Sequence, residues 1–231
     1  AEELAVEKKI LSETDKYITE DEILANSWIF FQAGYETTAS TLTFASYELA
    51  LNEDIQQKLY EEVMSAVDTK GEIDYDLLAR LPYLDAVISE TLRLHSPVLR
   101  LGRELGRECL NDYKLGDTGI TIKKGQAVEI PINAIHLSEE YYSSPNRFIP
   151  NRFLPENRHK LVPYTYMPFG VGPRNCIGMR FALMETKLGL AQIIKRFKLC
   201  RSSQTDVPLN LKVHPLLNTP KRVIISIKRR D

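Results

Sequence analysis

The sequence contains no long hydrophobic run: no window approaches about 18 consecutive apolar residues, so we expect no transmembrane helix within it. Charge of one sign is not in excess either, because 30 Lys and Arg residues face 31 Asp and Glu residues and the net charge is −1. Nucleic-acid-binding proteins are normally basic, so this balance argues against a nucleic-acid partner. The 43% hydrophobic and 26% charged residues are typical of an ordinary globular protein.

Cysteine is scarce, and the three residues (Cys109, Cys176 and Cys200) are odd in number and widely spaced. Neither a disulfide framework nor a CxxC metal site is therefore indicated. The four histidines form no HExxH or similar cluster, and we expect His136 and Cys109 to be structural. No signal peptide is visible, and the chain begins at Ala1 on a charged stretch. We therefore expect a fragment or a processed product, in which a missing N-terminal anchor would leave no trace.

The first half of the sequence predicts helices. Thr19-Glu20-Asp21-Glu22 is typical of a capping box, and a long segment runs from it to about Leu51. This segment is apolar nearly all round, and a helix of that kind sits deep in a larger protein. Apolar spacing predicts an amphipathic helix through Leu59 and Val63, a short helix from Asp74, and another over 83–94.

The second half predicts less regular structure. We expect short strands at 120–122 and 126–130, and a hairpin formed by 207–213 and 223–227. Residues 143–176 contain six prolines and little periodicity, which predicts a long ordered loop, and such loops are uncommon unless functional. A helix over 177–197 follows, with Phe181, Met184, Leu188 and Ala191 on one face. The expected fold class is mainly α with small β-sheets.

The strongest chemical signal is the stretch Phe169-Gly170-Val171-Gly172-Pro173-Arg174-Asn175-Cys176-Ile177-Gly178. A cysteine just before a helix meets free backbone N–H groups and the helix dipole, which favour a thiolate. The glycines let the backbone turn tightly and approach a flat ligand closely. Arg174 is a forked cation that suits a carboxylate such as a haem propionate, and Phe169 can shield the sulfur from water. This pattern favours a thiolate ligand over a buried structural cysteine.

This stretch resembles the haem-binding loop of the cytochrome P-450 superfamily of haem-thiolate monooxygenases, and residues 176–183 are especially similar to the microsomal, xenobiotic-metabolising branch. The resemblance covers essentially the whole chain but only the C-terminal half or so of a family member. We therefore expect residues 1–231 to form the C-terminal part of that fold, from the oxygen-activation helix onward, without the N-terminal half. The resemblance implies haem b with its iron ligated by Cys176. The further haem contacts that it implies are Ala33, Phe169, Gly170, Arg174 and Gly178.

Glu90-Thr91-Leu92-Arg93 is an E-x-x-R sequence, whose spacing puts both charges on one helical face, where they can pair. In the family this pair is joined by an arginine from the downstream loop, and Arg152 stands where that arginine is expected. Glu90, Arg93 and Arg152 thus resemble a buried charge triad that braces the haem pocket. Its role would be structural and not catalytic.

The third motif is Ala33-Gly34-Tyr35-Glu36-Thr37-Thr38. Gly34 and two successive threonines are poor choices for a helix interior, and an acid inside an apolar helix is hard to explain by packing. The segment resembles the family's oxygen-activation motif, which implies that the Thr37 hydroxyl holds a water beside the bound oxygen while Glu36 relays protons. The alternative is a helix kink with a solvated Glu36.

The resemblance also implies an arginine shortly after the E-x-x-R helix for a second propionate contact. Counting from Glu90 favours Arg103, although the near repeat around Arg107 leaves that residue open, and either could be a solvated arginine. Positions that would face the substrate by resemblance could equally belong to the core; they are Phe30, Gln32, Ala33, Pro97, Val98, Leu216 and Leu217.

The implied reaction is insertion of one oxygen atom from O2 into an apolar small organic substrate. Electrons would come from NADPH through a flavoprotein reductase, docked in part on the basic residues Arg180, Lys187, Lys195 and Arg196. The implied location is the cytosolic face of the endoplasmic reticulum membrane, with attachment only through the missing N-terminus. One alternative is a haem-thiolate isomerase or dehydratase, which needs no external electrons and no relay such as Glu36 and Thr37. The other is a non-catalytic haem-binding fragment.

Overall fold

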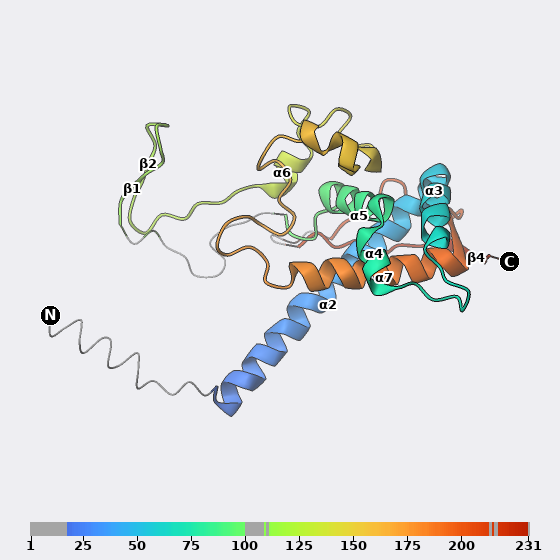
Figure 1. Cartoon of the computed structure of the whole chain (residues 1–231). Coiled ribbons are helices and arrows are strands. Elements are labelled where there is room, and N and C mark those ends of the chain that lie inside the picture. Colours follow the sequence, from blue (N-terminus) through green and yellow to red (C-terminus); the bar gives the residue numbers. More distant parts are fainter. Residues whose placement is uncertain (1–17, 100–108, 110, 213, 215–216, 231) are drawn as a thin grey trace. The chain divides into compact units, whose positions relative to one another are not determined.

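The computed structural model describes residues 18–99, 109, 111–212, 214 and 217–230. Helices dominate it, and two small antiparallel sheets complete it, as expected for a mainly α chain (Figure 1). The chain divides into two compact units, residues 1–36 and 37–231. The long helix α2 (Glu20–Leu51) passes from the first unit to the second between Glu36 and Thr37.

The described part of the first unit is the start of α2 and its cap. The Thr19 hydroxyl accepts a hydrogen bond from the Glu22 amide at 3.3 Å, and the Thr19 amide donates to the Glu22 carboxylate at 2.9 Å. This is the predicted capping box, and the bonds from Thr19 hold the pKa of the Glu22 carboxyl below its usual value. Large apolar side chains of this unit are exposed: Ile23, Leu24, Trp28, Ile29, Phe30, Phe31 and Tyr35.

The core of the second unit is built from the rest of α2 together with α3 (Glu53–Ser65), α5 (Pro82–Leu94) and α7 (Met179–Arg196). Leu49, Leu59, Leu84 and Leu190 each come from a different one of these helices, and all are fully buried. Burying one such side chain contributes about 1.5–3 kcal/mol, so the shared core fixes the helices against one another. In the part of the chain that the structure describes, no helix is both long and apolar enough to cross a membrane.

Carboxylates cap the starts of two helices of this unit, α4 (Tyr75–Arg80) and α5. Asp74 accepts hydrogen bonds from the Asp76 and Leu77 amides at 2.9 and 3.1 Å and so caps α4, as the sequence predicts. Pro82 begins α5, where its missing N–H is harmless. The carboxylate of Glu62, on α3, accepts from the next two amides of α5 at 2.8 Å each. These bonds link α3 to the helix that carries the E-x-x-R sequence.

The sheets differ from the predicted ones. The strand β3 (Phe197–Cys200) pairs antiparallel with β4 (Ser226–Arg229), so the hairpin predicted between 207–213 and 223–227 is wrong. In the described part of 207–213 an isolated bridge joins Leu211 to Pro220, and backbone hydrogen bonds to Thr219 and from Lys221 lie on either side of it. Prolines in and beside this segment remove the amide donors that a ladder needs.

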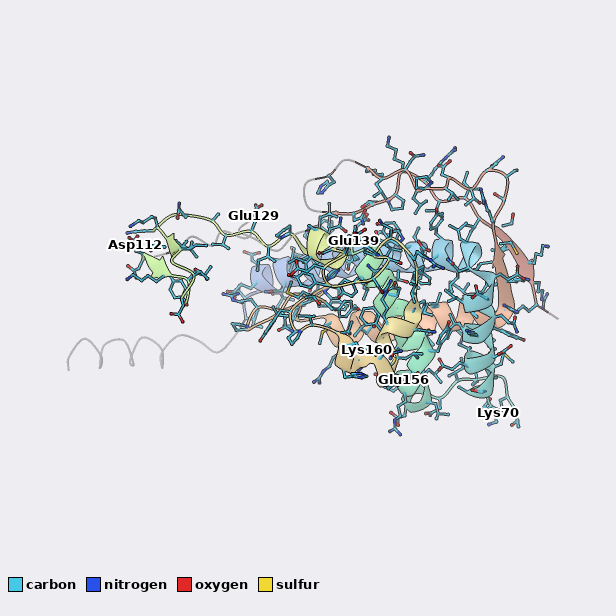
Figure 2. All side chains as sticks on the ribbon, turned by 90° about the horizontal axis from the view of Figure 1, so that it is seen from above. Lys70, Asp112, Glu129, Glu139, Glu156 and Lys160 are labelled. Carbon is cyan, nitrogen blue, oxygen red and sulfur yellow. The ribbon has the colours of Figure 1, made fainter. Side chains whose placement is uncertain are left out.

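The strand predicted over 120–122 is present in shortened form. It is β2 (Thr121–Ile122), which pairs with β1 (Tyr113–Lys114), but residues 126–129 are not a strand. Lys123 forms an exposed ion pair at 2.7 Å with Asp112, which Figure 2 labels beside this hairpin. The hairpin is therefore closed by backbone pairing and by a solvated charge pair.

A long irregular segment, which we call the meander (residues 137–178), joins α6 (Ile132–His136) to α7. It contains two short 3-10 helices, η2 (Pro150–Phe153) and η3 (Pro155–Lys160), and η2 packs against α5. Figure 1 shows α6 beside α5, and Figure 2 labels the exposed Glu139, Glu156 and Lys160 on the meander. The meander thus packs on α5 through η2 and ends at the start of α7.

Helix α7 begins at Met179, two residues later than predicted, and the predicted apolar face is only partly buried. Phe181 and Leu188 are 74% and 47% exposed, although spacing had grouped them with buried Ala191. A Cβ added at Gly189 would touch the Leu42 side chain at 3.4 Å, so α7 approaches α2 closely at this glycine. The buried side chains of α7 are Thr186, Lys187, Leu190, Ala191 and Ile194.

Candidate functional site

The loop from Phe169 to Gly178 is closed on itself. Gly170 and Gly172 have φ values of +73° and +88°, in the left-handed region that favours glycine. The Gly170 amide donates to the Met167 carbonyl at 3.0 Å, and the Cys176 amide donates back to the Phe169 carbonyl at 2.8 Å. The two predicted turn glycines therefore fold the loop so that Cys176 is presented next to the start of α7.

Gly178 acts differently from the other two glycines. It lies in the turn in which the Met179 amide donates to the Cys176 carbonyl at 3.4 Å, but its φ is −85°, which any residue adopts, so this turn does not require glycine. It stands at the N-cap of α7, and a Cβ placed there would lie 4.0 Å from the Cys176 Sγ. Its lack of a side chain keeps space free over the sulfur.

The Cys176 side chain is exposed, and apolar side chains are exposed around it. Ile177 is 86% and Phe181 74% exposed, and neither was identified from the sequence as part of the site. The signal that could have found them is their place in the sequence, because Ile177 follows Cys176 directly and Phe181 lies in the first turn of α7. Arg174 is exposed in the same loop, and Phe169 is half-buried against the core.

This arrangement fits haem b. A thiolate is a soft ligand suited to iron, the exposed apolar side chains suit a flat apolar ring, and Arg174 suits a propionate. Cys109 is occupied elsewhere, because its Sγ lies 2.8 Å from the Asn111 carbonyl. The described residues contain no cluster of three or more His, Cys, Asp or Glu side chains that could hold another metal. Arg103 and Arg107, the candidates for a second propionate contact, lie outside the described residues.

Glu90, Arg93 and Arg152 lie together, as the resemblance implies. Arg93 forms a fork with the Glu90 carboxylate at 2.7 and 2.8 Å, and both side chains are fully buried. Arg152 reaches the same carboxylate at 3.3 Å, and its Nη2 donates to the Ser143 and Ser144 carbonyls. The three charges join α5 to the meander.

Further contacts complete the coordination of this triad. Glu90 also accepts from the Ile149 amide at 2.8 Å, while Arg93 donates to the His136 carbonyl at 2.8 Å. The Arg93 guanidinium lies 5.0 Å from the centre of the Tyr142 ring, and burial raises the pKa of that tyrosine. Glu90 and Arg93 therefore each have several hydrogen-bond partners, which buried charges need if they are to be stable. The side chain of His136 is itself fully buried.

Glu36 and Thr37 are consecutive residues of α2, and both are partly buried. Residues 33–38 are helical throughout. The Thr41 hydroxyl donates back to the Thr37 carbonyl at 2.8 Å.

Two of the candidate substrate-facing residues meet. Val98 and Leu217 form an isolated antiparallel bridge, and the Asn218 amide donates to the Pro97 carbonyl at 2.9 Å beside it. Leu216 lies outside the described residues. The remaining candidates, Phe30, Gln32 and Ala33, are exposed on the part of α2 that belongs to the first unit.

The basic residues suggested as a reductase-docking face do not form one surface. Lys187 is buried, pairs with Asp85 at 3.0 Å and donates to the Ala79 carbonyl at 2.9 Å, so its place in that face is wrong. Lys195 is half-buried and donates to the Gly71 carbonyl. Arg180 and Arg196 are the two that remain exposed.

A family model described as Cytochrome P450 matches residues 3–227. Cytochrome P450 3A2 of Rattus norvegicus is 43% identical over 216 residues, which are 94% of this chain and 42% of that protein. Cytochrome P450 3A7 of Homo sapiens is 42% identical over 220 residues, or 95% of this chain and 42% of the relative. The chain thus spans about two fifths of the length of these relatives, and the family binds haem b through a thiolate. Because the family model covers all but the two ends of the sequence, the chain belongs to the cytochrome P450 family.

Proposed function

We propose that this chain carries the haem-binding part of a monooxygenase that inserts one oxygen atom from O2 into an apolar small organic substrate. The observation that carries the proposal is the exposed Cys176 thiol, held by a closed glycine loop at the start of α7 among exposed apolar side chains. Haem b, when bound, supplies the activation of O2 and the oxidation itself. Since the chain spans about 42% of its relatives, activity, substrate and partners are proposals for the whole protein.

Cys176 would hold the iron and donate electron density to it. Arg174 would bind a propionate, with Arg103 as the second such contact. Phe169 would shield the sulfur from water, while Gly170, Gly178 and Ala33 would leave room for the ring.

Glu36 and Thr37 would manage the protons of the reaction. The Thr37 hydroxyl would hold a water on the oxygen side of the site, and the Glu36 carboxylate would take a proton from solvent and pass it on. An acid and a hydroxyl in consecutive positions of a long, largely apolar helix support this role. The apolar substrate would lie against Phe30, Gln32, Val98, Leu216 and Leu217.

The electrons would come from NADPH through a flavoprotein reductase at the cytosolic face of the endoplasmic reticulum membrane. Arg180 and Arg196, both exposed on α7, would form part of the docking surface. Charge reversal at both positions should slow reduction and weaken its dependence on salt, whereas Arg229→Glu on β4, the matched control, should do neither. Unchanged reduction rates and an unchanged salt dependence in the double variant would remove these residues from the docking surface.

The decisive test of the proposed function is a carbon monoxide difference spectrum of the reduced, haem-loaded protein. Thiolate ligation gives a strongly red-shifted band, which should disappear in Cys176→Ala and persist in Cys200→Ala, the matched control. A band that survives Cys176→Ala, or that is lacking in the unaltered protein, would refute the ligand assignment. Turnover of a lipid peroxide without NADPH or reductase, in place of reductase-dependent oxidation, would favour an isomerase.

A further inference from the structure

His136 is the last residue of α6 and lies between the buried triad and the Cys176 loop. Its side chain is fully buried, and the residue makes two hydrogen bonds that point in different directions. The backbone carbonyl accepts from Arg93 Nη1 at 2.8 Å. The imidazole Nε2 accepts from the Met167 amide at 2.9 Å. One residue thus contacts both an arginine of α5 and the backbone that leads into the loop.

The bond to Met167 continues toward Cys176. The Met167 carbonyl accepts from the Gly170 amide at 3.0 Å, and the adjacent Phe169 carbonyl accepts from the Cys176 amide at 2.8 Å. A sequence of hydrogen bonds and single backbone links therefore runs from Arg93 through His136 and Met167 to the cysteine. All but one of the acceptors in this sequence are backbone carbonyls, which remain when their own side chain is substituted. The exception is the imidazole of His136.

The surroundings keep the imidazole in the form that this bond requires. To accept from an amide, Nε2 must carry no proton, so the ring must be neutral. Burial, together with the charge of Arg93, lowers the pKa of His136 to about 4, so the ring is neutral at pH 7. The ring also stacks against Tyr166 at 5.6 Å between centroids, and Tyr166 packs on Phe153 of η2 at 4.6 Å. Packing therefore fixes the ring orientation.

We propose that His136 is a positioning residue for Cys176: its imidazole transmits the fixed position of the buried triad to the loop that presents the thiolate. This inference rests on the proposed function, because it assumes that the Cys176 sulfur is the iron ligand. It predicts that a change at His136, a residue with no role in binding haem, alters the state of the thiolate. The alternative is a histidine that only fills space in the core.

Two substitutions separate these roles. His136→Phe keeps an aromatic ring for the stack with Tyr166 but removes the acceptor. His136→Gln places an amide oxygen at about the reach of Nε2 and so restores an acceptor. As a control, Gln56→Leu removes three hydrogen bonds of a buried residue that joins α3 to β3, away from the path to Cys176.

The first measurement is hydrogen–deuterium exchange of the haem-free chain over residues 165–178. In His136→Phe the Met167 and Cys176 amides should exchange faster, on the order of tenfold, because the bond that restrains their backbone is lost. In His136→Gln exchange should stay close to wild type. In Gln56→Leu the faster exchange should be confined to β3, including the Leu199 amide.

The second measurement is the carbon monoxide difference spectrum of the reduced, haem-loaded variants. In His136→Phe most of the red-shifted band should be replaced by the band of haem without thiolate ligation. His136→Gln and Gln56→Leu should keep the red-shifted band. Equal behaviour of the Phe and Gln variants, equal loss in Gln56→Leu, or unchanged exchange at Cys176 would each overturn the proposal. A wild-type protein without the red-shifted band would instead overturn the proposed function, and the exchange data would still decide the link through His136.

Discussion

Replacing the buried carboxylate of Glu90 by an amide, in Glu90→Gln, tests the triad directly. The substitution keeps the size of the side chain but removes the negative charge that Arg93 and Arg152 share. Glu90 and Arg93 side chains have no exposed surface, so water cannot replace the lost partner. Breaking a buried ion pair from one side leaves an uncompensated charge and costs about 3–5 kcal/mol.

A loss of this size should be easy to measure. For a chain of this length, each kcal/mol of lost stability lowers the thermal unfolding midpoint by about 2–4 °C, so the midpoint should fall by roughly 6–20 °C. The assay is urea and thermal unfolding followed by far-UV circular dichroism, which reports on the helices. Asp112→Asn is the matched control, because its partner Lys123 is 65% exposed and the midpoint should stay close to wild type.

A second variant separates the buried charge from the geometry. When Glu90 and Arg93 are both replaced by leucine, no buried charge is left unpaired within the pair, and stability should partly recover relative to Glu90→Gln. The reasoning would be refuted if Glu90→Gln unfolded at the same urea concentration as Asp112→Asn. It would also be refuted if the double variant lost as much as the sum of its single changes, since that would show no coupling between the two residues.

Three further outcomes follow from the structure. The folded-state pKa of His136 is about 4 against an ordinary value of 6.5, so its contribution to stability is complete above pH 6.5 and is lost as the pH falls toward 4. The free energy of unfolding, measured in urea, should therefore fall between pH 7 and pH 5 by about 2 kcal/mol more in the unaltered chain than in His136→Gln. Gly172→Ala should destabilise the chain by about 1–2 kcal/mol because the φ of Gly172 is +88°. Gly178→Ala should unfold like wild type, but spectral titration should show weaker haem binding because the new methyl group lies against the Cys176 sulfur. Glu62→Ala should cost about 1 kcal/mol by removing the acceptor for two α5 amides, and Glu61→Ala, its neighbour on α3, should cost less; equal urea midpoints for the two variants would count against this cap.

Features that depend on neighbours within a few residues could be predicted from the sequence. The capping box at Thr19 and the cap at Asp74 are present, and α2 ends at Leu51 as expected, because capping uses atoms three or four residues apart. The turn glycines of the Cys176 loop also follow from local backbone sterics. The same kind of pattern carried the family resemblance, since the residues of the loop lie within one short stretch.

Pairings between distant parts of the chain were predicted less well. The strand predicted at 223–227 was assigned to the wrong partner, since β4 (Ser226–Arg229) pairs with β3. Lys187 was placed on a docking surface although it lies buried against Asp85. A lysine whose position in the sequence predicts an exposed helix face can still be covered by another helix, and no local pattern shows which helix that will be. The orientation of α7 was likewise decided by the close approach of Gly189 to α2.

The sequence by itself determined which residue could be the thiolate ligand and which residue types surround it, because the glycines, the arginine and the coming helix act on Cys176 over a few positions. Only the tertiary structure decided what holds that loop in place. Arg152 reaches Glu90 across 62 residues, and His136 meets Met167 across 31. Such contacts exist because α5, α6 and the meander pack around one buried carboxylate, and a buried charge is stable only where distant chain segments supply its partners.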